Sequence, residues 1–162
     1  FPYTTLFRSV GSSNVTTMPA NDTDLVSVSP NSTVTQLSSK LFKLHYDLNA
    51  AQAYAGFYIN FNSKNDGSSA DLSAVSQLVF GLESSTTSKV KIEVEDSSGH
   101  RATYYAEGVD VSRNYYKFLV ASMSASLDLN HITSIGFGVD PNLVLTGNLT
   151  GDLLLELGGL SY

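Results

Sequence analysis

Residues 89–96 read KVKIEVED, and this segment decides the fold class. Apolar and charged side chains alternate along it without interruption: Val90, Ile92 and Val94 on one side, Lys89, Lys91, Glu93 and Glu95 on the other. A period of two is the pattern of a β-strand with one buried and one solvated face. The segment therefore predicts a strand that covers a hydrophobic core.

The same alternation recurs along most of the chain, and no convincing amphipathic helix interrupts it. The further predicted strands are 40–48, 57–61, 77–82, 102–106, 115–120, 132–140 and 152–157, with weaker ones at 25–28 and 33–37. Turn residues separate them, as in Asn65-Asp66-Gly67 and Ser97-Ser98-Gly99.

Strands that are apolar on one side need a second layer to bury that side. The prediction is all-β: a two-sheet antiparallel β-sandwich with the order of a jelly roll. In that order, one sheet holds 40–48, 77–82, 115–120 and 152–157. The other sheet holds 57–61, 89–96, 102–106 and 132–140.

Composition removes several classes of protein. The chain has 162 residues, which favours one domain with a real core, and a formal charge of −6, which argues against nucleic acids and anionic membranes as partners. It has no Cys, so disulfides, thiolate metal sites and Cys nucleophiles are excluded. No apolar run is long enough to span a membrane.

The first 23 residues are not expected to belong to the sandwich. Residues 1–9 (FPYTTLFRS) resemble the translation of a sequencing adapter, which would make the remainder a fragment of a longer protein. Residues 10–23 are rich in Ser, Thr and Asn and are predicted as a disordered lead or linker. The sandwich module is expected over residues 24–162.

Several phrases, in order, resemble carbohydrate-binding modules of the galactose-binding-domain-like jelly-roll type, which often accompany bacterial glycoside hydrolases. The phrases are LFKLHYDL, YAGFYINF, DLSAVSQLVFGL, KVKIEVEDSSGH, NYYKF, LDLNHITSIGFGVD and GDLLLEL. The resemblance implies a jelly roll that binds polysaccharide or oligosaccharide, outside the cell or on its surface, alongside other domains of the parent chain.

The outer face of the second predicted sheet offers groups that suit a sugar. Sugars present apolar C–H faces and hydroxyl edges, which match tyrosine rings rimmed by amides and carboxylates. Two outward glycines, Gly136 and Gly138, would leave a shallow trough. The candidate sugar-binding residues are Tyr58, Asn60, Lys91, Glu93, Tyr104 or Tyr105, and Asp140.

A structural calcium ion is a second expectation, which the resemblance implies. Related modules often hold one where the early chain meets the last strand. The oxygen donors here would be Asp22 or Asp24, with Asp152 and Glu156. Calcium takes six to eight oxygen ligands, many from backbone carbonyls.

Glu93 and Glu95 offer a catalytic alternative, because they share one face of a strand with their Cα atoms roughly 6–7 Å apart, and the two carboxyl groups of a retaining glycosidase lie about 5–5.5 Å apart. The lysines on the same face favour plain charge pairing instead. Three hypotheses stay open: a non-catalytic carbohydrate-binding module that tethers a larger secreted protein to polysaccharide, a structural or protein-interaction sandwich of a cell-surface protein, and a small glycoside hydrolase.

Overall fold

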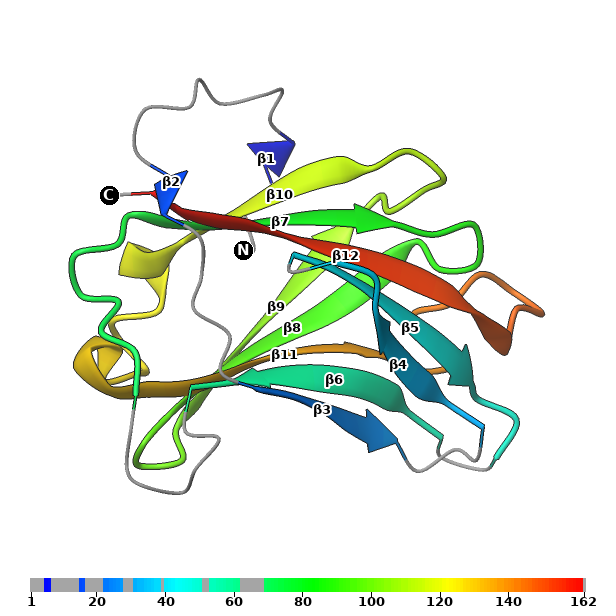
Figure 1. Ribbon diagram of the computed structural model, residues 1–162, viewed down its shortest axis with the longest axis horizontal. Coiled ribbons are helices and arrows are strands. Elements are labelled where there is room, and N and C mark those ends of the chain that lie inside the picture. Colours follow the sequence, from blue (N-terminus) through cyan, green and yellow to red (C-terminus); the bar gives the residue numbers. More distant parts are fainter. Residues whose placement is uncertain are drawn as a thin grey trace.

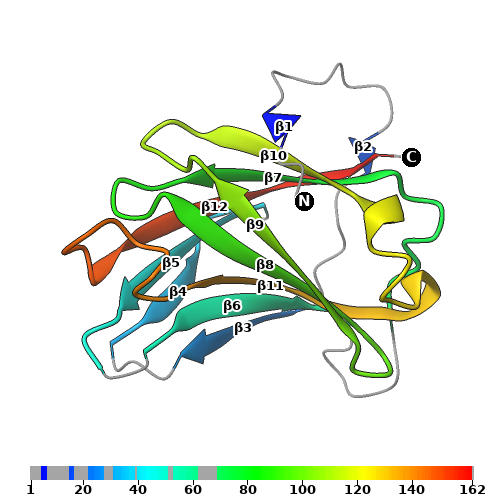
Figure 2. The ribbon, with the colours of Figure 1, turned by 180° about the vertical axis from the view of Figure 1, so that it is seen from behind.

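Two antiparallel sheets pack face to face in this computed structural model, which describes residues 31–38, 40–50, 53–61 and 69–161, with only the backbone at 5–6, 15–16, 22–27 and 159–161 (Figures 1 and 2). Sheet A has the order β1 (Thr5–Leu6), β10 (Asn114–Leu119), β7 (Gln77–Glu83), β12 (Thr150–Ser161), β5 (Leu41–Asp47) and β4 (Thr33–Gln36), with β2 (Val15–Thr16) also paired to β12. Sheet B has the order β3 (Asp22–Ser27), β6 (Ala55–Asn60), β11 (Ile132–Val139), β8 (Lys89–Asp96) and β9 (Arg101–Glu107).

The predicted all-β sandwich is confirmed, and so is the division of the strands between two sheets. All four predicted members of each sheet lie in the same sheet of the structure. The weak strands at 25–28 and 33–37 correspond to β3 and β4, which lie at the edges of sheets B and A. Much of residues 1–23 lies outside the described residues, so the adapter, the linker and the domain boundaries stay predictions.

Helical structure is confined to two single turns in the described part of the chain, η1 (Val120–Ser122) and η2 (Leu129–His131). Neither of these turns is long and apolar enough to cross a membrane, and they are the whole helical structure of the described residues.

The core is a layer of aromatic and aliphatic side chains between the sheets. The ring of Phe57 lies 5.9 Å from that of Phe42 in sheet A and 5.5 Å from that of Phe137 in sheet B. The rings of Phe137 and Phe80 meet edge to face at 4.8 Å, which joins the two sheets. These residues are at most 2 % exposed, as the alternation predicts for inward positions.

A buried aspartate fastens the turn between β8 and β9. Asp96 is 1 % exposed, and its carboxylate accepts hydrogen bonds from the backbone N–H groups of Ser98, His100 and Asp128 at 2.9, 3.0 and 2.9 Å. It also lies 3.0 Å from Nδ1 of His100. Burial by itself would raise the pKa of Asp96, but these hydrogen bonds outweigh it and lower the pKa to about 2.

Two tyrosines within the core differ in one hydrogen bond, and this difference gives a prediction. Tyr46 and Tyr116 are both 0 % exposed. The Tyr46 hydroxyl donates to Thr86 at 2.8 Å, whereas the Tyr116 hydroxyl has no hydrogen-bond partner among the described residues. Burial raises the pKa of Tyr116 to about 12.

We expect Tyr116→Phe to raise the free energy of unfolding by about 1 kcal/mol, because an unpaired buried hydroxyl is costly. Tyr46→Phe is the matched control, and it should lower the free energy of unfolding by about 1 kcal/mol, because it removes a hydrogen bond. Urea unfolding of the three proteins measures both changes. Equal losses in the two variants would contradict the prediction.

Candidate functional site: a groove on the outer face of sheet B

The outer face of sheet B carries a groove of about 380 Å³, within the usual size range of ligand pockets. It lies over β6, β11 and β8, reaches the start of β9, and extends to the turn after β11. Its lining residues are Tyr54, Ala55, Gly56, Phe57, Tyr58, Lys91, Glu93, Arg101, Gly136, Phe137, Gly138, Val139, Asp140 and Leu143.

Two glycines on neighbouring strands face each other across the floor of the groove. Gly56 of β6 and Gly138 of β11 are cross-strand partners. A Cβ on Gly56 would collide with the backbone oxygen of Phe137, whereas a Cβ on Gly138 would meet only the oxygen of Ala55, at 3.6 Å. The floor above Gly138 is therefore open because the residue has no side chain.

This arrangement corrects the predicted trough, which was expected over Gly136 and Gly138. The ring of Tyr58 lies across Gly136 and occupies the space where a Cβ would stand. Gly136 lies directly between Tyr58 of β6 and Glu93 of β8 in the sheet, so the ring crosses β11 toward Glu93. Their oxygen atoms are 3.5 Å apart. Of the two predicted glycines, only Gly138 leaves the floor open, and its cross-strand neighbour there is Gly56 of β6.

Glu93 is the centre of an ion-pair network beside this floor. Its side chain is 12 % exposed, and its carboxylate lies 2.8 Å from Nζ of Lys91 and 3.3 Å from Arg101. Arg101 also contacts Glu95, at 2.9 Å, so one guanidinium bridges the two carboxylates. The hydrogen bond to Glu93 raises the pKa of Lys91, while burial, and then the negative charge of Glu93, raise the pKa of Tyr58.

The structure brings together four of the predicted sugar-binding residues, which all line the groove: Tyr58, Lys91, Glu93 and Asp140. Asp140 also accepts a hydrogen bond from the N–H of Asn142 at 2.7 Å, which holds the turn at the end of the groove. Asn60 and Tyr105 have the outward parity of their strands but are not among the lining residues.

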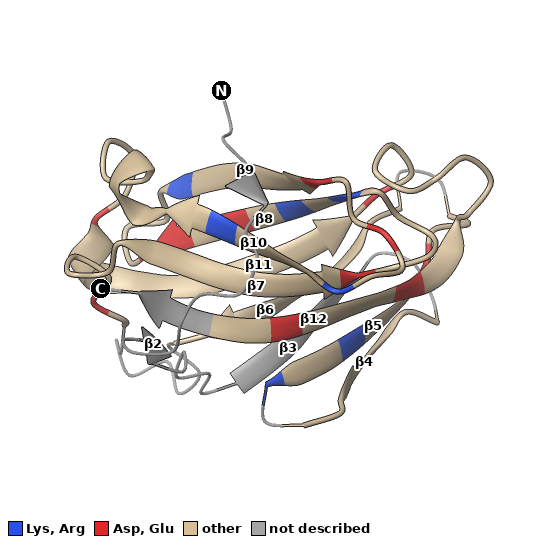
Figure 3. Ribbon diagram, turned by 90° about the horizontal axis from the view of Figure 1, so that it is seen from above, with Lys and Arg blue, Asp and Glu red and all other residues tan. Residues whose placement is uncertain are grey.

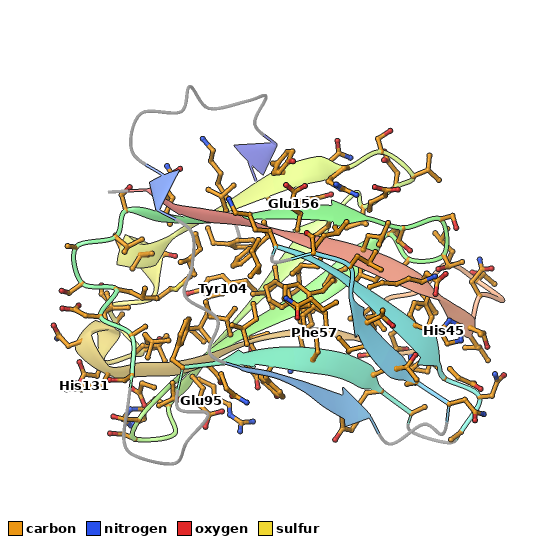
Figure 4. The ribbon with its side chains drawn as sticks, viewed as in Figure 1. His45, Phe57, Glu95, Tyr104, His131 and Glu156 are labelled. Atoms are coloured by element: carbon orange, nitrogen blue, oxygen red, sulfur yellow. The ribbon has the colours of Figure 1, made fainter. Side chains whose placement is uncertain are left out.

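Tyr104 is a correction, because its side chain does not belong to the outer face. It is the cross-strand partner of Ile92, which points into the core. Its ring lies 5.9 Å from that of Phe118 of sheet A, in the layer between the sheets (Figure 4). Sequence alone left the parity of the Tyr104–Tyr105 pair open, and the register of β8 and β9 assigns Tyr105 to the outside.

Sequence reasoning missed three side chains of the groove: Tyr54, Arg101 and Leu143. Tyr54 is 45 % exposed and lies two and four residues before Gly56 and Tyr58, so extending the alternation of β6 backwards would have found it. Arg101 follows from the hairpin register, which pairs it with Glu95. Nothing in the sequence pattern marks Leu143, which lies in the loop after β11.

The expected calcium ligands are not gathered in one place. Asp152 and Glu156 lie four residues apart on β12, roughly 13 Å along a strand. Asp152 pairs with Lys43 and His45, and Glu156 pairs with Arg113. Asp22 and Asp24 lie on β3 in the other sheet, and their side chains are outside the described residues. Among described side chains, no group of three His, Cys, Asp or Glu is placed to hold a metal ion, and calcium stays a prediction of the resemblance.

The outer face of sheet A repeats the local design of the groove without its open floor. Tyr115 of β10, Gly81 of β7 and Glu156 of β12 lie side by side on three neighbouring strands. The Tyr115 hydroxyl donates to Glu156 at 2.9 Å, and Arg113 bridges Glu156 and Glu83 at 3.1 Å each. Tyr115, Arg113 and Glu156 crowd the position of a Gly81 Cβ, so this row is filled.

Comparison with known proteins gives relatives by structure only. No sequence family matches the chain, and no curated protein does either. Among solved structures, a family 11 carbohydrate-binding module of the cellulosomal cellulase Lic26A-Cel5E of Clostridium thermocellum is similar at TM-score 0.55 and 15 % identity, over 99 % of this chain and 95 % of that one. A family 30 carbohydrate-binding module is similar at TM-score 0.53 and 10 % identity, over 82 % and 84 %.

An exo-β-agarase structure matches at TM-score 0.60 and 15 % identity, over 93 % of this chain. The chain spans only about a quarter (25 %) of that protein's length. At these identities the likeness shows the fold: a β-sandwich that also occurs in isolated carbohydrate-binding modules and as a part of larger enzymes.

Proposed function

We propose that this chain is a non-catalytic carbohydrate-binding module that holds a larger extracellular or cell-surface protein on polysaccharide. The observation that carries the proposal is the groove on sheet B. Its floor is open above Gly138, where a sugar chain can approach the sheet, and its lining includes Tyr54 and Tyr58. Tyrosine rings can stack on the C–H faces of sugars, and Asp140 and Glu93 offer acceptors to hydroxyl groups. The near full-length likeness to two carbohydrate-binding modules supports it.

The charges of the groove favour an uncharged glycan. Lys91 and Arg101 both pair with Glu93, so the cations of the groove already have carboxylate partners. Asp140 adds a negative charge at the end of the groove, and the whole chain carries −6. A polyanion would be repelled, whereas the hydroxyls of a neutral polysaccharide would find both donors and acceptors.

Affinity electrophoresis on a panel of neutral and acidic polysaccharides tests the proposal, and Tyr54→Ala is the informative variant. Because Tyr54 is 45 % exposed, its loss should leave the fold intact while weakening binding about tenfold, as expected for one stacking contact of about 1 kcal/mol or more. Tyr115→Ala, on the opposite face, is the matched control and should bind normally.

Three outcomes would contradict this assignment. No retardation of the wild type on any polysaccharide would remove sugar binding and favour a structural or protein-interaction role. Loss of binding in Tyr115→Ala alone would move the site to sheet A. Release of reducing sugar by the wild type would instead support a hydrolase that uses Glu93 and Glu95.

A further inference from the structure

Strand β9 forms one edge of sheet B, and its only strand partner in the described part of the chain is β8. The N–H of Asp96 donates to the oxygen of His100 at 3.1 Å, which sets the phase of this antiparallel ladder. Hydrogen-bonded and non-hydrogen-bonded pairs alternate along such a ladder. Residues 102, 104 and 106 therefore bond to β8, and the backbone groups of residues such as Arg101, Thr103 and Glu107 point away from it.

Charges on this edge are confined to its two ends and have opposite signs. Arg101 begins β9 and Glu107 ends it, and the five residues between them are uncharged. Figure 3 shows the basic and acidic ends of the strand. Edge strands are usually protected from pairing by charges or proline within them, and β9 has neither in its middle.

We propose that β9 pairs antiparallel with β9 of a second copy of this chain, about a two-fold axis that passes Tyr104. In this register Arg101 of each copy lies opposite Glu107 of the other, and Ala102 lies opposite Ala106. The outward backbone groups of the two strands then face one another as hydrogen-bonded pairs. The interface is isologous, so both ends gain the same contacts.

In this register the ion pairs within each copy join into rows of charges that cross the interface. Arg101 contacts Glu95 at 2.9 Å, and Glu107 contacts Lys89 at 2.6 Å. Across the axis, each row reads Glu95, Arg101, then Glu107 and Lys89 of the second copy, so the sign of the charge alternates over four adjacent strands. Opposite charges on directly opposed strand positions are favourable. The guanidinium of Arg101 already contacts Glu93 and Glu95, and its five N–H donors leave room for a third carboxylate, Glu107 of the second copy.

Two five-stranded sheets joined in this way become one sheet of ten strands. The two grooves then open on the same side of it, since both lie on the outer face of sheet B. A long ligand that met both grooves would gain from the high effective concentration of the second. Dimerisation is measured without any sugar, so its failure is distinct from failure of the proposed function.

Sedimentation equilibrium of the chain, from about 10 µM to about 1 mM, tests the dimer. Thr103→Pro is the disrupting variant, because the Thr103 N–H points away from β8 and proline would remove only the outward donor. It should raise the dimer dissociation constant at least tenfold, while Thr103→Val should leave it unchanged. A wild type that stays monomeric over this range, or Thr103→Pro that dimerises equally well, would overturn the proposal.

A charge-swap experiment tests the register itself. Arg101→Glu places glutamate opposite Glu107, and Glu107→Arg places arginine opposite Arg101, so each variant alone should be monomeric. Mixed in equal amounts, they should form a heterodimer, because each glutamate then faces an arginine. Thermal unfolding confirms that both variants are folded. A mixture that stays as monomeric as its components would show that this register is wrong.

Discussion

Asp96→Ala should lower the free energy of unfolding by about 3 kcal/mol or more, because each buried donor left without a partner costs about 1–3 kcal/mol and a broken buried network is among the causes of the largest losses. The carboxylate is buried, and its removal leaves the N–H groups of Ser98, His100 and Asp128 without their acceptor. Chemical denaturation measures the loss. Asp128→Ala is the matched control: its carboxylate also accepts from a nearby N–H and contacts His131, but it is 46 % exposed, so its loss should be much smaller.

The same carboxylate makes stability depend on pH in a defined direction. The pKa of Asp96 is about 2 in the folded chain and about 3.8 when unfolded, so acid protonates the unfolded chain first. Its contribution, about 2 kcal/mol, is present above pH 4 and is lost as the pH falls toward 2. Asp96→Asn should flatten this part of the stability curve. An acid limb of unchanged slope in the variant would show that Asp96 is not the group responsible.

Gly138→Val should weaken polysaccharide binding at least about tenfold and should leave the fold intact. A Cβ at this position meets only the oxygen of Ala55, at 3.6 Å, which is an ordinary contact, and the methyl groups beyond it would occupy the groove floor. Valine also suits a strand better than glycine, so the free energy of unfolding should stay equal or rise by a few tenths of a kcal/mol. Calorimetric titration and urea unfolding measure the two effects together.

Thr35→Val on β4, in sheet A, is the matched control for a new valine on an exposed strand position, and it should bind normally. Stability and binding are expected to move independently in Gly138→Val, which separates a blocked site from a damaged fold. A folded Gly138→Val protein with wild-type affinity would place the ligand elsewhere.

Most of the fold could be predicted because one signal, the alternation of inward and outward side chains, is strong in eight segments. Val90, Ile92 and Val94 are at most 1 % exposed, as KVKIEVED predicts. The edge strands were harder to bound. In β4 only Val34 is even partly buried, so its sequence has little need to alternate apolar and polar residues. Residues at sheet edges carry weaker patterns because they have a core on one side and a neighbour on only one flank.

The candidate site was only half predictable, for a different reason. Alternation gives the face of a residue but neither its cross-strand partner nor its rotamer. That Tyr58 covers Gly136, and that Gly56 lies opposite Gly138, depends on the register of β6 against β11. Register is fixed by long-range pairing and not by the local sequence. The inward direction of Tyr104 follows from the same kind of information, the register of β8 and β9.

The position of β12 has a consequence for how the chain acquires its structure. This strand follows all the others along the sequence, yet it lies in the interior of sheet A, between β5 and β7. During synthesis, the edges of β5 and β7 that pair with β12 therefore stay unpaired until β12 has left the ribosome. Sheet A can close only after translation has passed residue 150, and pairings this distant in sequence form slowly. The nascent chain is most exposed to misassembly in that interval.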